Sequence, residues 1–417
     1  MSALTNWAGN VTFGAARIHR PTSVPEVQEL VAGSTRLRVL GSGHSFSPVA
    51  DTDGDLVLLG DLPPRCDIAA DGHSATVSAG LRYGEIAPPL HEAGLALANM
   101  GSLPHICVAG AAATGTHGSG DATPPLASSV VGLDVVTADG TLVHLDETDP
   151  WFPGAVVSLG TIGVVAAVTL RLEPTFDVAQ TVYDRLPMDA LVAHLDEVFA
   201  SAYSVSVFST LRADVADQVW LKRRTDGRYP DVGDDWLGAT RADGPRHPVP
   251  GESPDSCTEQ LGRPGPWFER LPHFRLDHRP SSGAELQSEF LVPREHAVAA
   301  VEVLRTLAGV VAPPLQVAEL RTVAADDRWL SMAHGRDSLA LHFTWHPDLA
   351  GALSAVRAVE QALAPLAARP HWGKVFAMTP EQVAPLYPRL ADARALRREL
   401  DPDDVFGNPF VDRYVGC

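Results

Sequence analysis

Two predicted strands in the second half of the chain carry polar residues at alternating positions. In LQVAELRTV, Glu319 and Arg321 lie two positions apart, and in SLALHFTWH the same holds for His342 and Thr344. Because side chains alternate between the two faces of a strand, each pair shares one face. Such a polar face has two interpretations. It is either the wall of a site that binds a ligand, or a solvent-facing strand surface with an ordinary Glu–Arg pair.

Lysine occurs only at Lys222 and Lys374, and every other basic residue is arginine. A lysine retained in such a chain can mark a need for a compact point charge, or it can be drift at a surface site. Lys374 alternates with Trp372 in RPHWGKVFAM, and an ammonium among aromatic residues needs a counter-charge, which Glu319 could supply. Lys222 lies in the charged stretch LKRRTDGR, so we interpret it as a surface residue.

A glycine loop follows the strand-like segment RLRVL. It reads Gly41-Ser42-Gly43, and His44 comes next. The Rossmann fingerprint fails because Phe46 stands at the third glycine position, and a Walker loop would need GK[ST]. The loop is either a nest of backbone N–H groups for a pyrophosphate or a glycine-rich hairpin with a solvent histidine. This stretch alone leaves both open.

Two further loops of small residues favour a bound cofactor. Residues 99–120 read NMGSLPHICVAGAAATGTHGSG, and residues 158–165 read SLGTIGVV. Small residues at this density let a backbone approach a flat ligand closely. Three such loops within the first 165 residues, each beside a strand, predict an extended cofactor across one domain, and a dinucleotide fits better than a mononucleotide.

Composition narrows the class of protein. The 417 residues carry a formal net charge of -19, which argues against nucleic acid or an anionic membrane as partner. No run of about 18 apolar residues indicates a membrane span. The N-terminal MSALTNWAGN lacks the pattern of a signal peptide, so we expect a cytoplasmic protein. The four scattered cysteines predict neither a zinc site nor a disulfide framework, and we expect no metal. No heptad run demands a partner, so we expect a monomer.

The elements that must position these residues form a mixed α+β pattern. Residues 1–175 contain short strands, turns and a few helices, and we expect one domain there. Residues 176–370 contain longer strands and helices and form a second domain, in which residues 225–273 are a long irregular connection. Residues 371–417 are a C-terminal segment. MDALVAHLDEVFASA within the second domain is predicted as one helix.

The order of motifs along the chain resembles the vanillyl-alcohol-oxidase type of flavoprotein and, within it, the alditol oxidases. The motifs are GSGHSF, SLPH with ATGTHGSG, SLGTIGVV, HWGK and NPF, and they span nearly the whole chain. The resemblance implies a two-domain α+β fold with an FAD-binding domain and a substrate (cap) domain, whose antiparallel sheet is flanked by helices. The C-terminal segment returns to the flavin site in this family.

The resemblance also implies how the cofactor is held. His44 matches the family histidine whose ring nitrogen is bonded to the 8α-methyl carbon of FAD, a tether that raises the flavin potential. Some relatives carry a second tether through cysteine, and Cys107 is either such a tether or a buried free thiol. The other cofactor-binding residues implied are Gly41, Ser42, Gly43, Ser45, Phe46, Ser102, Gly110, Thr114, Gly115, Thr116, His117, Gly163, Val164 and His371.

The substrate site implied by the resemblance combines the polar strand faces with the first domain. It comprises Ser102, Glu319, Arg321, His342, Thr344 and Lys374, of which Arg321, Lys374 and Glu319 are the catalytic residues. The implied reaction is oxidation of the terminal hydroxyl of a linear polyol such as xylitol or sorbitol to the aldose. A hydride passes to flavin N5, and O₂ is reduced to H₂O₂. Gly101 would leave room for O₂ beside the flavin.

Two other functions remain open. HWGK-like segments are not exclusive to polyol enzymes, so a sugar-lactone oxidase or dehydrogenase of the same fold is the nearest alternative. A flavin- or sugar-binding protein without catalysis is the second. It should have lost part of the set formed by Glu319, Arg321 and Lys374, all of which this chain retains.

Overall fold

The computed structural model describes residues 4–281 and 283–416. Cys417 and the first three residues of the N-terminal stretch considered above lie outside the described residues. The other three cysteines, Cys66, Cys107 and Cys257, are free thiols. Across the residues described, no helix combines the length and the apolar character needed to cross a membrane.

The first part of the chain builds two sheets. A parallel sheet has the order β1 (Arg17–His19), β3 (Asp55–Val57), β2 (Leu37–Val39). An antiparallel sheet has the order β4 (Cys66–Ile68), β5 (Ser74–Ser78), β9 (Val164–Arg171), β7 (Val130–Val136), β8 (Leu142–Asp146). The turns predicted at the two Asp-Gly pairs join β4 to β5 and β7 to β8, and Gly72 and Gly140 have φ of 71° and 80°. A short pair, β6 (Leu95–Ala96) and β10 (Glu173–Pro174), leads into the second part.

The second part builds one ten-stranded antiparallel sheet. Its order is β14 (Asp235–Trp236), β15 (Ala239–Arg241), β11 (Asp177–Pro187), β13 (Val215–Arg224), β12 (Ser204–Ser209), β18 (Leu315–Val323), β19 (Ser338–Trp345), β17 (Leu286–Pro293), β20 (Arg369–Pro370), with β16 (Pro264–Pro266) paired to β11. All residues of β18 and β19 are buried. Solvent-facing surfaces are therefore excluded for these two strands.

The connection over residues 225–273 differs from the prediction of an irregular loop. It contains β14, β15 and β16, three short strands that add to the sheet beside β11. Two of the three residues of β16 are proline, which lacks a backbone donor and is tolerated in a sheet only at its margin. Runs of two or three residues among Pro, Gly and Asp carry too little alternation to be recognised in the sequence.

Helix ends follow capping rules. The Ser23 side chain accepts a hydrogen bond from the Glu26 amide, and Asp348 and Asn408 cap two later helices in the same way. The predicted single helix over residues 188–202 is instead two short helices that meet at His194. The helices are α1 (Val24–Gly33), α2 (Tyr83–Glu92), α3 (Val108–Ala113), α4 (Phe152–Val156), α5 (Met188–Ala193), α6 (Leu195–Ala200), α7 (Ala297–Val311), α8 (Leu349–Leu363), α9 (Pro380–Val383), α10 (Leu390–Leu400) and α11 (Pro409–Val415).

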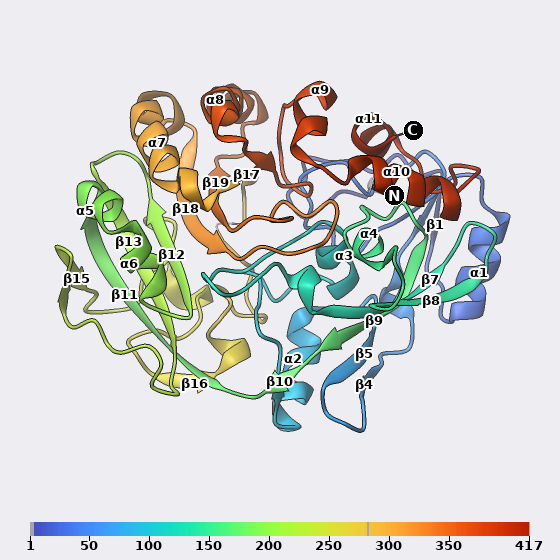
Figure 1. The fold of residues 1–417 in the computed structure, drawn as a ribbon, viewed down its shortest axis with the longest axis horizontal. Helices are drawn as coiled ribbons and strands as arrows, with labels where there is room; N and C mark the ends of the chain where they lie inside the picture. Colours follow the sequence, from blue (N-terminus) through green and yellow to red (C-terminus); the bar gives the residue numbers. More distant parts are fainter. Residues whose placement is uncertain (1–3, 282, 417) are drawn as a thin grey trace.

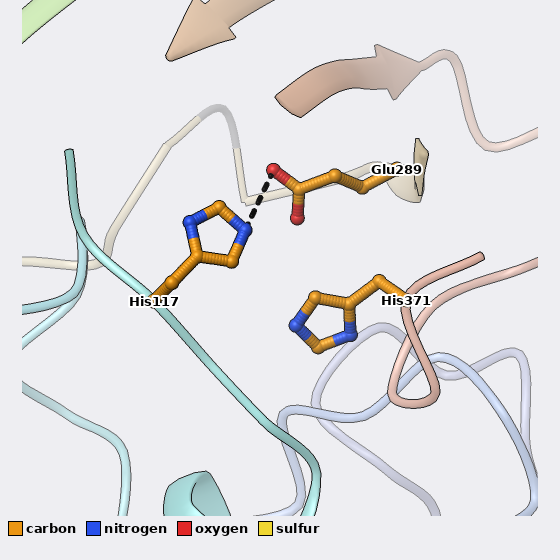
Figure 2. A group of neighbouring side chains, drawn as sticks. All are labelled: His117, Glu289 and His371. Atoms are coloured by element: carbon orange, nitrogen blue, oxygen red, sulfur yellow. Dashed lines mark ion pairs between the residues drawn. The ribbon is translucent and has the colours of Figure 1, made fainter. Parts of the chain in front are cut away.

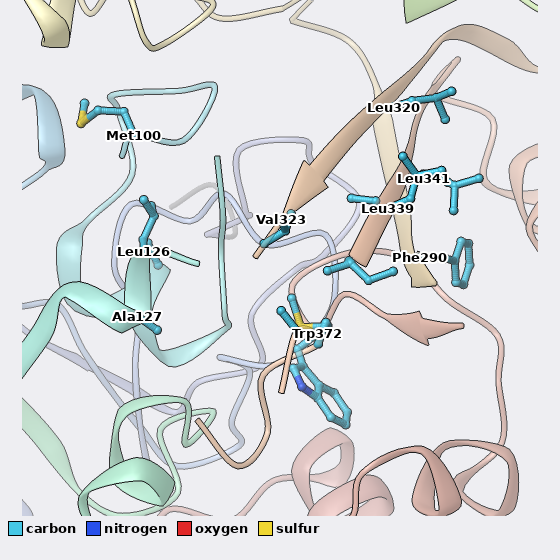
Figure 3. Close-up of a cluster of buried hydrophobic side chains, with 14 of the residues drawn as sticks. Met100, Leu126, Ala127, Phe290, Leu320, Val323, Leu339, Leu341 and Trp372 are labelled. Atoms are coloured by element: carbon cyan, nitrogen blue, oxygen red, sulfur yellow. The ribbon is translucent and has the colours of Figure 1, made fainter. Parts of the chain in front are cut away.

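Figure 1 shows how the two parts lie together. The ten-stranded sheet occupies one half of the molecule, the antiparallel five-stranded sheet occupies the other, and helices α7 to α11 run along one side of both. A single hydrophobic cluster continues from one half into the other. It includes Met100, Leu126 and Ala127 from the first part, Leu320 and Leu341 from β18 and β19, and Trp372 beyond them (Figure 3).

Residues 405 and 406 are hydrogen-bonded to the first part of the chain. The amide of Leu37 in β2 donates to the carbonyl of Val405 at 2.7 Å. The buried Arg38 guanidinium donates to Phe406 at 2.7 Å and Gly160 at 3.0 Å, and to two further carbonyls, those of Val49 and Leu159. Arg38 thus joins three segments that are far apart in the sequence. The limits of the domains at residues 175 and 370 stay a prediction.

Candidate active site

A cavity of about 430 Å³ lies between the two parts and is lined by residues of both. This volume is in the range of small-molecule and cofactor sites. Most of the residues singled out in the sequence line it: Gly41, Ser42, Gly43, His44, Ser45, Phe46, Ser102, Gly110, Thr114, Thr116, His117, Gly163, Glu319, Arg321, His342, Thr344, His371 and Lys374. The cavity therefore brings the glycine loops and the polar strand faces into one site.

Gly115 and Val164 do not line the cavity. Gly115 turns the chain after α3 with φ of 70°, and a side chain there would meet Met332. Val164 begins β9 and faces a hydrophobic cluster, so its neighbour Val165 lines the cavity instead. In both cases the small-residue motif was recognised, but the direction of the single residue was not.

The glycine loop is attached to the C-terminal segment. The Phe46 amide donates to the Gly373 carbonyl at 2.7 Å, and the Ser47 hydroxyl donates to the Trp372 carbonyl at 2.7 Å. These bonds place HWGK, which carries Lys374, directly beside GSGHSF. The contact explains how segments 325 residues apart in the sequence lie at one site.

The space beside the glycines of the cavity wall fits a flat dinucleotide. A Cβ added at Gly110 would meet nothing within 4 Å, so the glycine faces open space along the wall. At Gly41 a Cβ would lie 3.4 Å from the Cys107 side chain, so this part of the wall is already in van der Waals contact behind the glycine. Cys107 is buried, and its Sγ donates to the Gly80 carbonyl at 3.3 Å. The small residues therefore leave space along the cavity wall where a cofactor would lie.

His44 is held as a neutral imidazole. Its ring stacks on Trp7 with centroids 5.3 Å apart, and burial, together with His105 and Arg82, lowers its pKa to about 4. Within residues 4–281 and 283–416, neither ring nitrogen accepts or donates a protein hydrogen bond. An unprotonated, unengaged ring nitrogen is the form that can act as a nucleophile.

Glu289 is the centre of the polar wall, although the sequence analysis did not single it out. It is 1% exposed and lies on β17, between β19 and β20. Arg321 contacts Oε1 at 2.6 Å and Lys374 contacts Oε2 at 2.6 Å. Burial opposes its ionisation, but Lys374, His117 and Arg321 outweigh this and lower its pKa well below the ordinary value. Glu289, and not Glu319, is thus the counter-charge of Lys374.

Glu289, His117 and His371 offer three potential metal-ligand atoms within 4.8 Å of one another (Figure 2). His117 Nε2 lies 3.3 Å from Glu289 Oε1. A cation placed among them would face the Arg321 and Lys374 charges that already occupy both oxygens of the carboxylate. We therefore assign the three residues to the polar wall and not to a metal centre.

Proton positions at the substrate end follow from the donors. Lys374 can only donate, so His342 Nδ1, 2.6 Å from Nζ, accepts. His342 Nε2 then carries the proton and donates to Thr344 Oγ1 at 3.2 Å, which leaves the Thr344 hydroxyl proton free for a ligand. Arg321 likewise donates to Ser102 Oγ at 3.2 Å and frees the Ser102 proton.

A second group missed in the sequence lies behind Glu319. His273 Nε2 is 2.8 Å from Glu319 Oε1, and His273 Nδ1 is 3.0 Å from Lys222 Nζ. Lys222 is 0% exposed, so its interpretation as a surface residue is wrong. It lies on β13 between Gln180 of β11 and Ser204 of β12, and its Nζ donates to the carbonyl of Pro272 in the following loop. In the sequence, only the rarity of lysine could have indicated that Lys222 is buried.

The comparisons with known proteins agree with this site. The FAD binding domain family matches residues 15–146, and the D-arabinono-1,4-lactone oxidase family matches residues 284–414. Alditol oxidase of Streptomyces sp. is 49% identical over 98% of both chains. L-gulono-1,4-lactone dehydrogenase of Mycobacterium tuberculosis is 30% identical over 99% of both chains. The chain belongs to the vanillyl-alcohol-oxidase-type flavoprotein family.

As a member of this family, the protein is an FAD-dependent oxidoreductase. The fold agrees, because the crystal structure of cholesterol oxidase from B. sterolicum superposes with a TM-score of 0.82 at 15% identity. The match covers 99% of this chain and 96% of that chain. The predicted α+β flavoprotein fold, with an antiparallel sheet flanked by helices in the second part, is confirmed. The roles of individual site residues stay predictions.

Proposed function

We propose that the protein is an alditol oxidase that oxidises the terminal hydroxyl of linear polyols, xylitol and sorbitol among them, with O₂ reduced to H₂O₂. The observation that carries this proposal is the wall formed by Glu319, Arg321 and Lys374 with Ser102 and Thr344. It presents charged groups beside two free hydroxyl donors. The 49% identity to an alditol oxidase over nearly the whole chain supports it.

Each side chain has a distinct task in this proposal. Arg321 and Lys374 polarise the reacting hydroxyl and stabilise negative charge on its oxygen, as preorganised cations do. Glu319 accepts a hydrogen bond from a hydroxyl, and its contact of 3.5 Å with Arg321 Nε holds the guanidinium. FAD, when bound, supplies the acceptor for the hydride from the substrate carbon. Ser102 and Thr344 donate to the next hydroxyls along the polyol, so analogues that lack them are penalised.

The experiment that tests the proposal is anaerobic mixing of the purified protein with xylitol, followed by air. We expect the visible flavin absorption to bleach and then recover with formation of peroxide. Bleaching without recovery would retain the substrate but make the protein a dehydrogenase. A yellow protein that no polyol bleaches would refute polyol oxidation.

We further propose that His44 bonds FAD covalently through a ring nitrogen. Its neutral, unengaged imidazole on the cavity wall supports this. After acid precipitation, we expect yellow colour in the wild-type pellet and free flavin in the supernatant of His44→Ala. Flavin that leaves the wild-type pellet would contradict the bond. His105→Ala, whose ring centroid lies 6.3 Å from that of His44, is the control and should keep the flavin in the pellet.

The second candidate is oxidation of a sugar lactone. The match of residues 284–414 to the lactone oxidase family favours it, as does the relative that is a lactone dehydrogenase. L-gulono-1,4-lactone offered in parallel with xylitol separates the two. Turnover of the lactone without turnover of any polyol would select the second candidate.

A further inference from the structure

Lys222 carries a buried amino group, and burial lowers its pKa to about 7. Nζ donates to the carbonyls of Leu271 and Pro272 and to Nδ1 of His273. None of these acceptors carries a charge, and Lys222 does not line the cavity. A buried ammonium is costly unless it is fully hydrogen-bonded. Three acceptors meet that need, and one of them is a titratable ring that reaches the cavity.

The neighbours of His273 determine where its proton lies. The Glu319 carboxylate can only accept, so Nε2 of the neutral ring carries the proton, and Nδ1 accepts from Lys222 Nζ at 3.0 Å. That proton points at Glu319 Oε1, 2.8 Å away. The direction of the chain is therefore fixed from Lys222 through His273 to the carboxylate. The ring is held in place by edge contacts with Phe208 and Trp220, at 5.5 and 5.3 Å between centroids.

Glu319 is left with one oxygen for a ligand. Oε1 accepts from His273 and contacts Arg321 Nε at 3.5 Å. Within the described part of the chain, Oε2 has no protein partner, and Glu319 lines the cavity. We propose that Lys222 and His273 are positioning residues that hold Glu319 from behind and present its Oε2 to a substrate hydroxyl. This inference rests on the proposed polyol oxidation, in which Glu319 accepts a hydrogen bond from the substrate.

Kinetic coupling separates positioning from a merely structural role. Lys222→Met removes the donor that holds His273 Nδ1, so the ring is no longer held behind Glu319 and we expect kcat/KM for xylitol to fall about tenfold or more. Lys222→Met combined with Glu319→Gln should then be no slower than Glu319→Gln alone, because both changes act on one group. If the two losses in kcat/KM multiply, Lys222 does not act through Glu319 and the proposal fails.

A pair of histidine variants gives a test that does not depend on Lys222. His273→Gln places an amide donor near the former Nε2 and should retain most of kcat/KM, whereas His273→Leu removes the donor and should lose about tenfold. Both variants keep the two carbonyl acceptors of Lys222. His194→Gln, at an exposed histidine 2.9 Å from Glu197, is the matched control and should behave as wild type. Equal activity of the Gln and Leu variants would overturn the proposal.

Nitrogen-15 spectra of the flavin-loaded protein labelled at histidine measure the proton position without turnover. We expect His273, identified by the signal lost in His273→Gln, to have an unprotonated Nδ1 and a protonated Nε2. A proton on Nδ1 would contradict the chain of donors. A wild-type protein with the expected spectrum but no polyol turnover would refute the proposed function while confirming that chain.

Discussion

At the scale of single residues, the site depends on two buried carboxylates that share their cations. Glu289 and Glu319 are buried, and the cations that contact them are Arg321 and Lys374. Arg321 contacts both carboxylates, so neither can be changed without affecting the other. Burial tends to lower the pKa of Arg321, but the two carboxylates raise it, which keeps the guanidinium charged.

Glu289→Gln should therefore damage both stability and activity. The change leaves the Lys374 ammonium and the Arg321 guanidinium buried beside a neutral amide, which costs roughly 3 kcal/mol of stability by analogy with other buried pairs. We expect a lower Tm and a loss in kcat of at least about tenfold, measured with xylitol.

The control for this change is Glu302→Gln, at a half-exposed carboxylate 3.1 Å from Arg305 on α7. Its Tm and kcat should match wild type. If the two variants behave alike, Glu289 is not the counter-charge of the site.

Substitutions of Gly101 test whether this residue gives O₂ access to the flavin. A Cβ at this position would lie 3.4 Å from Ile106 and 3.8 Å from Thr116, so alanine fits at ordinary contact distances and valine adds bulk to the cavity wall. We expect Gly101→Val to slow the return of flavin absorption in air, with bleaching by xylitol largely retained. The rate at which flavin absorption returns in Gly101→Ala should lie between those of wild type and Gly101→Val. Unchanged recovery in the valine variant would contradict a role for Gly101 in oxygen access.

At the scale of elements, strand alternation predicted the polar faces but not their partners. Glu319 with Arg321, and His342 with Thr344, could be assigned to shared faces because only the local period of the strand is needed. Glu289 could not, because its role comes from the pairing of β17 with β19, where it lies opposite His342. Lys222 reads as part of a charged run, and only the neighbouring strands show that it is buried.

The parallel sheet of β1, β3 and β2 should give the protein a specific sensitivity to acid. Burial of Asp55 opposes its ionisation, but hydrogen bonds from Arg17, His19 and Ser34 outweigh this and lower its pKa from 3.8 to about 2. The folded state therefore binds this proton less readily than the unfolded chain. The stabilisation is complete above about pH 4 and is lost as pH falls towards 2.

Thermal melts from pH 7 down to pH 2.5 measure this effect. Asp55→Asn should have a lower Tm at pH 7, and its difference from wild type should shrink as pH falls below 4. Asp61→Asn, at an exposed carboxylate 3.8 Å from Arg20, should show no such convergence. If the difference in Tm between Asp55→Asn and wild type does not change with pH, Asp55 is not the origin of the acid sensitivity.

At the scale of the whole molecule, the cofactor loops and the polar wall come from separate parts joined by one continuous hydrophobic core (Figure 3). The large exposed apolar side chains of the described residues are spread over several elements, such as Ile18 on β1 and Leu142 on β8, and the two on α7, Val298 and Val310, lie near its opposite ends. Isolated apolar residues of this kind are normal on monomers. The net charge of -19 adds repulsion between copies.

We therefore expect a monomer in solution. Light scattering on the purified protein should give a mass near 44.3 kDa that does not change with concentration. A mass near twice this value would show that a face considered solvent-exposed is an interface.

The contacts of Arg38 and Leu37 with residues 405 and 406 have a consequence for synthesis of the protein on the ribosome. The first 175 residues emerge early, but their parallel sheet lacks these partners until residues 405 and 406 have been translated. At about 5–20 residues per second, this leaves a wait of roughly 10 to 50 seconds. The nascent residues 1–175 must survive that interval incomplete. The glycine loop, whose Phe46 amide donates to the Gly373 carbonyl, can be fully assembled only after residue 373 has been translated.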